Sequence, residues 1–132
     1  MLLEEGLYTF LQSRAGLTAL VGTRIYPVMA PQGVALPYVA FDRVDTRPEQ
    51  ALGEAAGLAT TRVQFDCYAA GAKQAKELAD ALRQALDGQS GTWGSVVVGA
   101  CLWLNELDVY EPETGSYAVP VDFDVIYEMT PP

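Results

Sequence analysis

Histidine is absent from the 132 residues, and its absence removes the most versatile catalytic side chain. Ser-His-Asp and Cys-His pairs need it, and it is the commonest general base near neutral pH and the commonest metal ligand. Glycine-rich phosphate loops are missing as well, because neither G-x-x-x-x-G-K-[ST] nor G-x-G-x-x-G occurs. The sequence therefore predicts no catalytic residue, no bound metal and no cofactor.

Long hydrophobic runs and cysteines are also scarce. No apolar stretch reaches the roughly 18 residues of a membrane-spanning helix, and the acidic start MLLEEGLYTF lacks the positive charge of a secretory signal. We therefore expect no membrane partner and a protein that stays where it is made. Cys67 and Cys101 lie in apolar surroundings without the spacing of a zinc or redox pair. Two buried thiols are expected, and a disulfide between them stays open.

Positive charge is missing from the last third of the chain. Residues 1–83 hold 8 bases and 9 acids, which gives 8 − 9 = −1, whereas residues 84–132 hold no Lys or Arg. The acids of this second part are Asp87, Glu106, Asp108, Glu111, Glu113, Asp122, Asp124 and Glu128, which gives −8 and a total of −9. Such a surface cannot neutralise phosphates, so the sequence excludes a DNA-gripping role.

The remaining pattern predicts one α+β domain over residues 1–132. Apolar spacing predicts an N-terminal helix starting near Leu3 and a long amphipathic helix over about 72–86, with Gly88 as its C-terminal cap. Short strands are predicted at 23–27, 38–45 and 58–68. With a long C-terminal β-hairpin after the second helix, this order favours a mostly antiparallel sheet.

Two segments of this pattern carry specific expectations. Residues 46–57 contain one proline and two glycines without alternation, so we predict a loop, of a length that is often functional. The run Val96–Tyr110 is apolar on both faces as far as Leu104, which predicts a central strand covered on both sides. The returning strand, Tyr117–Glu128, is expected to turn inward Val119, Val121, Phe123, Val125 and Tyr127.

The acidic residues of this hairpin are the one candidate for chemistry. Asp122 and Asp124 are two apart on one strand, so they share a face and could approach Asp108 or Glu106. Clustered carboxylates can hold Mg²⁺ or act as an acid/base pair; the alternative is the solvated face of a half-buried sheet. Three arginines on neighbouring strands, Arg24, Arg43 and Arg62, are expected to pair across strands with Asp42, Asp45 or Asp66.

Several short blocks follow one another in order over roughly residues 1–128. They comprise Arg24–Pro27 (RIYP), Ala30–Gly33 (APQG), Leu36–Val39 (LPYV), Val63–Tyr68 (VQFDCY) followed by an Ala-rich helix, and Tyr110–Gly115 (YEPETG) leading into Val121–Phe123. Taken together, these blocks resemble a tail-completion family of phages. Each block alone is unspecific, whereas the ordered set is fairly specific.

The resemblance implies a tail terminator, or head-to-tail joining protein, of long-tailed phages or phage-derived particles such as gene transfer agents. Its expected role is structural: a hexameric ring that ends polymerisation of the tail tube and presents a surface to the head connector. The implied partners are further copies of the chain, the tail tube protein and the head-connector protein, and DNA passes without specific binding. Assembly is expected in the bacterial cytoplasm, and the mature protein at the head-tail junction.

For such a ring, the loop 46–57 is a candidate contact with a neighbouring subunit or ring, through Arg47, Glu49, Gln50 and Glu54. An anionic channel wall would repel DNA, and the candidates for it are Asp108, Asp122 and Asp124. The alternatives are that these acids meet solvent, that the protein is another neck component such as a head-completion protein, and that it is a small metal-dependent hydrolase using Asp122 and Asp124.

Overall fold

The computed structural model describes residues 1–51, 54–111 and 115–129, which form three helices and seven strands. The elements are α1 (Leu3–Gln12), α2 (Ala15–Val21), β1 (Ile25–Pro27), β2 (Tyr38–Ala51), β3 (Glu54–Ala69), α3 (Ala72–Leu86), β4 (Gly91–Trp93), β5 (Val96–Glu106), β6 (Val109–Glu111) and β7 (Ser116–Glu128). The predicted helices, and most of the predicted strands, are present.

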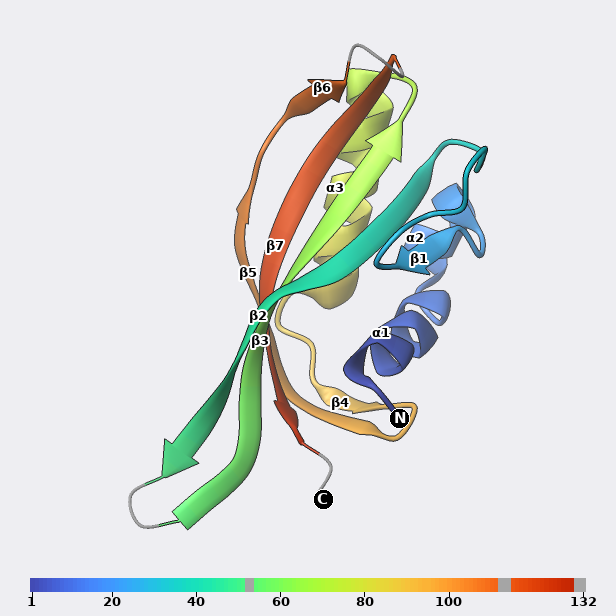
Figure 1. The fold of residues 1–132 in the computed structure, drawn as a ribbon. Coiled ribbons are helices and arrows are strands. Elements are labelled where there is room, and N and C mark those ends of the chain that lie inside the picture. The colour runs from blue at the N-terminus through green and yellow to red at the C-terminus, as the bar shows by residue number, and fades with distance from the viewer. Residues whose placement is uncertain (52–53, 112–114, 130–132) are drawn as a thin grey trace.

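One curled sheet forms the body of the protein, and the helices cover one of its faces (Figure 1). The strand order is β1-β2-β3-β7-β5-β4, with β6 pairing β7 beyond the end of β5. All described strand pairs are antiparallel except β1 with β2. The α+β prediction with a mostly antiparallel sheet is therefore confirmed.

Alternation along the two central strands builds the core. Val63, Phe65 and Cys67 of β3 are buried on the helix side, and so are all five residues of β7 that were predicted to turn inward. The ring of Phe65 packs against Phe41 at 5.3 Å and against Phe123 at 5.7 Å between ring centroids. Burial of each such ring contributes roughly 1.5–3 kcal/mol to the free energy of unfolding, so this packing adds substantially to stability.

Helix α3 has the predicted bounds and packs on this core through its predicted stripe, which comprises Ala75, Leu78, Ala79, Leu82 and Leu86. Gly88 follows with a φ of 77°, a conformation that glycine adopts without steric cost. Both cysteines are free and buried, as expected. Burial raises the pKa of the Cys101 thiol to about 12 and that of Cys67 further, so neither thiol ionises near neutral pH. No described helix is long and apolar enough to cross a membrane.

The predicted loop at 46–57 is wrong, because β2 and β3 continue through this segment as a hairpin that extends beyond the helix-covered part of the sheet (Figure 1). Pro48 fits there because β1 pairs only with residues 39–41, so that β2 is an edge strand at this point. Gly57, with a φ of 70°, lies where the register shifts. Neither face of this hairpin is covered by a helix, which explains why its sequence shows no apolar alternation.

The predicted two-sided cover of the strand after Val96 is also wrong. β5 lies near the end of the sheet, and β4 pairs only with residues 96–98 of it. The chain then leaves the ladder at 107–108, where Leu107 N donates to Pro120 O at 3.0 Å, and resumes as β6. Pro120 is tolerated there because this break in the ladder needs no donor from β7. As a result Leu102, Trp103 and Leu104 remain exposed.

Two helical glycines test the packing of α1 and α2. A methyl group on Gly6 would meet Trp93 O at 2.8 Å, whereas a methyl group on Gly16 meets nothing within 4 Å. Gly6→Ala should therefore lower the free energy of unfolding by about 1–3 kcal/mol through overpacking, while Gly16→Ala should raise it by about 0.5–1 kcal/mol through helix propensity. Urea unfolding of the matched pair measures both, and a stabilising Gly6→Ala would contradict this packing.

Candidate functional site

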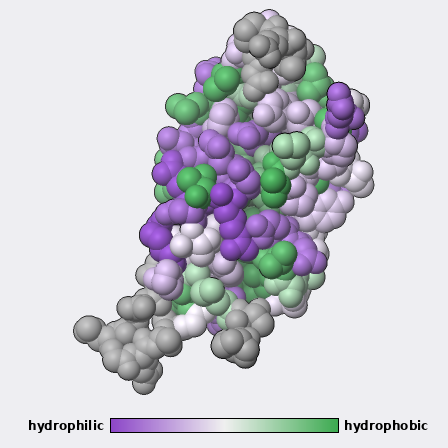
Figure 2. Space-filling view, in the orientation of Figure 1, coloured by the Kyte–Doolittle hydropathy of each residue, from purple (hydrophilic) through white to green (hydrophobic). Residues whose placement is uncertain are grey.

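The face of the sheet opposite the helices, called here the outer face, carries the candidate polar site. Figure 2 views the molecule from the side on which the strands lie in front of α3, and hydrophilic residues gather across its middle. The register places on this face Asp42 and Asp45 of β2, Arg62, Gln64 and Asp66 of β3, and Asp122 and Asp124 of β7. The predicted shared face of Asp122 and Asp124 is therefore confirmed.

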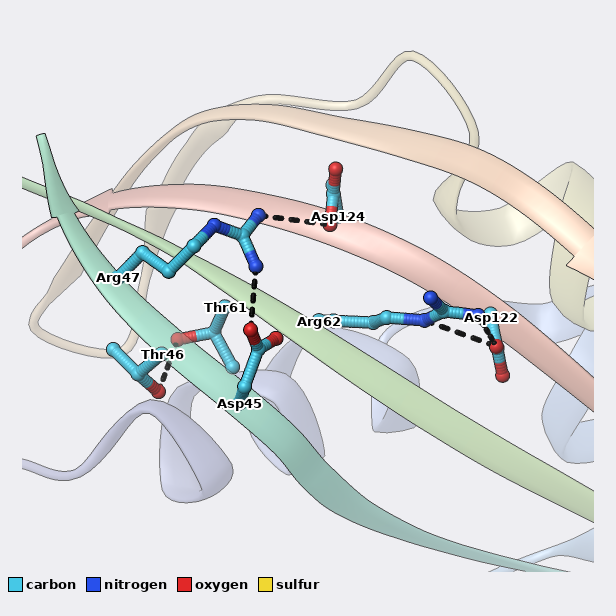
Figure 3. A network of polar contacts seen from close by, with 7 residues as sticks. All are labelled: Asp45, Thr46, Arg47, Thr61, Arg62, Asp122 and Asp124. Atoms are coloured by element: carbon cyan, nitrogen blue, oxygen red, sulfur yellow. Dashed lines mark hydrogen bonds and ion pairs between the residues drawn. The ribbon is translucent and has the colours of Figure 1, made fainter.

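Asp122 is bound by an arginine of the adjacent strand (Figure 3). Arg62 donates from Nε to Asp122 Oδ2 at 3.1 Å, and its Nη2 bonds to the same oxygen. The side chain of Asp122 is only 8% exposed, and its Oδ1 has no partner among the described residues. A buried carboxylate needs a compensating cation, and Arg62 supplies it here.

Arg47 joins three strands on the same face. Its guanidinium lies 2.7 Å from Asp45 of its own strand and 3.9 Å from Asp124 of β7, so that it reaches across β3 (Figure 3). On the helix side of the same strands, the Thr46 and Thr61 hydroxyls are 2.9 Å apart. These contacts are partly exposed, and each adds little stability by itself. Together they hold the base of the hairpin against β7.

The partners predicted for the three arginines were wrong. Arg62 pairs with Asp122, and Arg24 donates from Nε to Pro37 O at 2.9 Å. Arg43 instead lies on the helix side, where it binds Glu4 of α1 at 2.8 Å and donates to the hydroxyl of Tyr127. A register shift between Arg43 and Asp45 interrupts the alternation that the prediction assumed.

The Arg43 contact ties the first helix to the sheet. Burial alone would raise the pKa of Glu4, but the hydrogen bond and the charge of Arg43 outweigh it and hold this pKa below its ordinary value. The ion pair therefore stabilises the fold above about pH 4.5, and its contribution is lost as the pH falls through the lowered pKa of Glu4. This pair is structural and lies on the side away from the outer face.

The other predicted site residues lie apart from this network. Asp108 lies 3.0 Å from Lys76 of α3, in an open cleft beside that helix, and not with Asp122 and Asp124. The side chains of Glu49, Gln50 and Glu54 are outside the described part of the structure, although the backbone pairing of these residues belongs to the β2–β3 hairpin. The candidate carboxylates are thus divided between two sides of the molecule.

This arrangement does not support metal chemistry. Over residues 1–51, 54–111 and 115–129, no group of three or more Cys, Asp or Glu side chains could hold a metal ion. Asp122 and Asp124, the proposed ligands of the hydrolase alternative, face Arg62 and Arg47. A guanidinium within contact of each carboxylate occupies the position that a cation would need.

A second surface was missed by the sequence reasoning. We call it the β5–β6 strip, and it comprises Leu102, Leu104, Leu107, Val109 and Tyr110, each between 40% and 57% exposed. Trp103 lies beside it with the Arg83 guanidinium 5.1 Å from its ring centroid. The signal in the sequence is the apolar run after Val96, which by itself predicts burial within the chain. Exposed apolar runs of this kind mark interaction surfaces.

A family comparison gives these surfaces a context. The family model of the tail completion protein gp17 matches residues 5–128, which spans the helices and the whole sheet. The chain belongs to this tail completion family. The resemblance inferred from the sequence blocks is thereby confirmed.

Solved structures share the fold of this tail completion protein. A chain from the virion of a native gene transfer agent particle superposes with a TM-score of 0.78 at 23% identity, covering 92% of this chain and 91% of that one. A second solved chain gives a TM-score of 0.62 at 14% identity, with 100% and 99% covered. At these identities the likeness concerns the fold. No curated protein matches the sequence.

The Arg62–Asp122 pair in this tail completion protein can be tested by a double-mutant cycle. Arg62→Met should lower the free energy of unfolding because it leaves a buried carboxylate without its cation. Adding Asp122→Asn should recover part of that loss, so the two changes are coupled. The control is Lys73–Glu77, an exposed pair 3.8 Å apart that should show no measurable coupling in the same urea titrations. Additive losses at Arg62 and Asp122 would contradict the assignment.

Proposed function

We propose that this protein is the structural ring subunit that caps the tail tube, ends its polymerisation and joins the tail to the head connector. The observation that carries the proposal is its membership of the tail completion family over residues 5–128. The shared fold with a chain of a gene transfer agent virion supports a place in such a particle. The resemblance implies six copies and assembly in the bacterial cytoplasm.

The chemistry of the chain supports a role without catalysis. The sequence has no histidine and no phosphate loop. The candidate carboxylates face arginines on the outer face or Lys76 beside α3. The protein has instead an extended sheet, a projecting hairpin and an exposed apolar strip. These are the parts that a subunit of a larger assembly needs.

The outer face is the surface that we propose for the channel through which DNA passes. Its central part holds the acids Asp42, Asp45, Asp66, Asp122 and Asp124 against the bases Arg47 and Arg62, which gives 2 − 5 = −3 per copy. A negative wall repels phosphates, and a channel of low dielectric focuses that field. Of the three acids that the sequence predicts to line the channel, we therefore keep Asp122 and Asp124, because Asp108 lies on the α3 side.

Reconstruction of the neck in assembled particles tests this function. We expect six copies in one ring at the end of the tail tube, with the outer face toward the lumen. Particles lacking the protein should have tails of uncontrolled length that do not join heads. A three-fold or twelve-fold ring, or a position inside the head, would favour another neck component instead. Six copies with the outer face turned outward would refute only the channel assignment.

The β2–β3 hairpin is the part that we propose contacts the adjacent ring or subunit. Beyond Pro48 it extends past the helices, so the strands at its end rest on each other and not on the core (Figure 1). An arm of this kind costs conformational entropy without adding core burial. A binding role is what would favour its retention. Glu49, Gln50 and Glu54 lie on this arm, and Arg47 lies at its base.

Shortening the arm tests whether assembly requires it while folding does not. Replacing residues 49–56 by a two-residue Asn-Gly turn should leave the melting temperature within a few degrees, because every described core residue is retained. Tails should nevertheless be of uncontrolled length or fail to join heads. A second variant keeps the hairpin length but carries Ser and Thr at 49–56, and so distinguishes reach from side-chain contacts. Normal particles from both variants would dismiss the contact.

A further inference from the structure

We propose that neighbouring copies join side by side, with the β5–β6 strip of one copy seated on a loop surface at the other end of the sheet of the next. The loop surface comprises Leu20, Arg24, Val28, Met29 and Leu36. This inference rests on the proposed ring and names the two surfaces that close it. The occupant of the strip is therefore a second copy of this chain.

The strip begins on a strand that has no neighbouring strand on one side. As far as Leu104 the sequence is apolar on both faces, as in a strand covered on both sides. Within the described residues, however, β5 beyond position 98 has β7 on one side and no strand on the other. Asp87 and Gly88 bind the backbone at Trp103 N and Cys101 O, and leave the side chains of the strip uncovered. Burial of these side chains requires another chain.

The loop surface has the complementary features. Val28 and Met29 are 70% and 79% exposed, the largest fractions among the exposed large hydrophobic residues. Val28 has a φ of 72°, which is costly for a β-branched residue. Backbone strain of this kind persists mainly at functional positions. Next to the two residues lies an open hollow of about 550 Å³, lined in part by Leu36, Tyr38 and Tyr68, with room for apolar side chains.

The positions of the two surfaces suit a closed ring. β1, which leads into the loop surface, is the first strand of the sheet order, whereas β5 lies at the other end (Figure 1). Head-to-tail rings need two different surfaces on opposite sides of the subunit. Contacts at these two sides leave the β2–β3 hairpin free for the axial partner and the middle of the outer face free for the channel, although Asp66 and Leu102 border that middle part.

The distribution of charge favours one pairing of these surfaces. Residues 12–41 contain Arg14 and Arg24 and no acid, whereas residues 84–132 contain eight acids and no base. Arg24 donates to the backbone oxygens of Pro37 and Leu20 and has no described carboxylate within ion-pair distance. Glu106 and Asp87 flank the strip. Arg24 at the loop surface can therefore attract Glu106 and Asp87 at the strip, although Asp66 also lines the hollow.

Thiol cross-linking tests the contact in assembled particles. A chain carrying both Met29→Cys and Leu104→Cys, treated with a short bis-maleimide, should give a ladder of covalent multimers on a denaturing gel. Each single variant should give at most dimers. The pair Val44→Cys with Leu104→Cys is the matched control, since Val44 is exposed but belongs to neither surface. Cys67 and Cys101 are buried and should not react.

Assembly yield gives the second measurement. Leu107→Asp and Met29→Asp should each lower particle yield roughly tenfold or more, as for the loss of an interface anchor. Val44→Asp should not, and all three exposed positions should keep the melting temperature. A ring seen in the particles together with no Met29–Leu104 ladder, or with normal yields from both Asp variants, would overturn the inference and leave the proposed function standing. Absence of any ring would overturn the proposed function itself.

Discussion

The pairing of β3 with β7 is the interaction on which the rest of the structure depends. The two strands run antiparallel from Leu58–Glu128 to Ala69–Tyr117 without a register shift. On one face they supply Phe65 and Phe123 to the core, and on the other they bring Arg62 to Asp122. β2 and β5 extend this pair to either side, so the helix contacts, the outer face and both ends of the sheet are all positioned by it.

Local periodicity explains what could be predicted from the sequence. Helix α3 and the inward residues of β3 and β7 are each packed on one face by a single core. Their burial can therefore be predicted from the regular spacing of apolar residues along the sequence. The hairpin beyond Pro48 lacks that signal because no core covers it. The Arg62–Asp122 pair joins residues 60 apart, and strand order, which no local pattern encodes, is what brings them together.

The misjudged strand β5 shows a different limit. Its apolar run predicts burial, and the prediction assigned the cover to the same chain. In the structure the cover is missing, and Leu104 and Leu107 face outward. Hydrophobic patterning reports the surface that is buried in the final assembly, whichever chain supplies the other side. A strand pattern that exceeds what the monomer can bury is therefore a sign of quaternary structure.

The uneven distribution of charge along the chain also affects which surfaces of two copies would attract each other. Two β5–β6 strips brought together would set Glu106 and Asp87 of one copy against those of another, and two loop surfaces would set arginine against arginine. Like-charge contacts of this kind oppose an isologous dimer, which would bury the same apolar residues and stop growth at two. The unlike pairing remains, and it can be repeated from copy to copy. A net charge of −9 distributed evenly would make no such distinction. The location of the charge, and not its total, is therefore what favours the proposed head-to-tail ring.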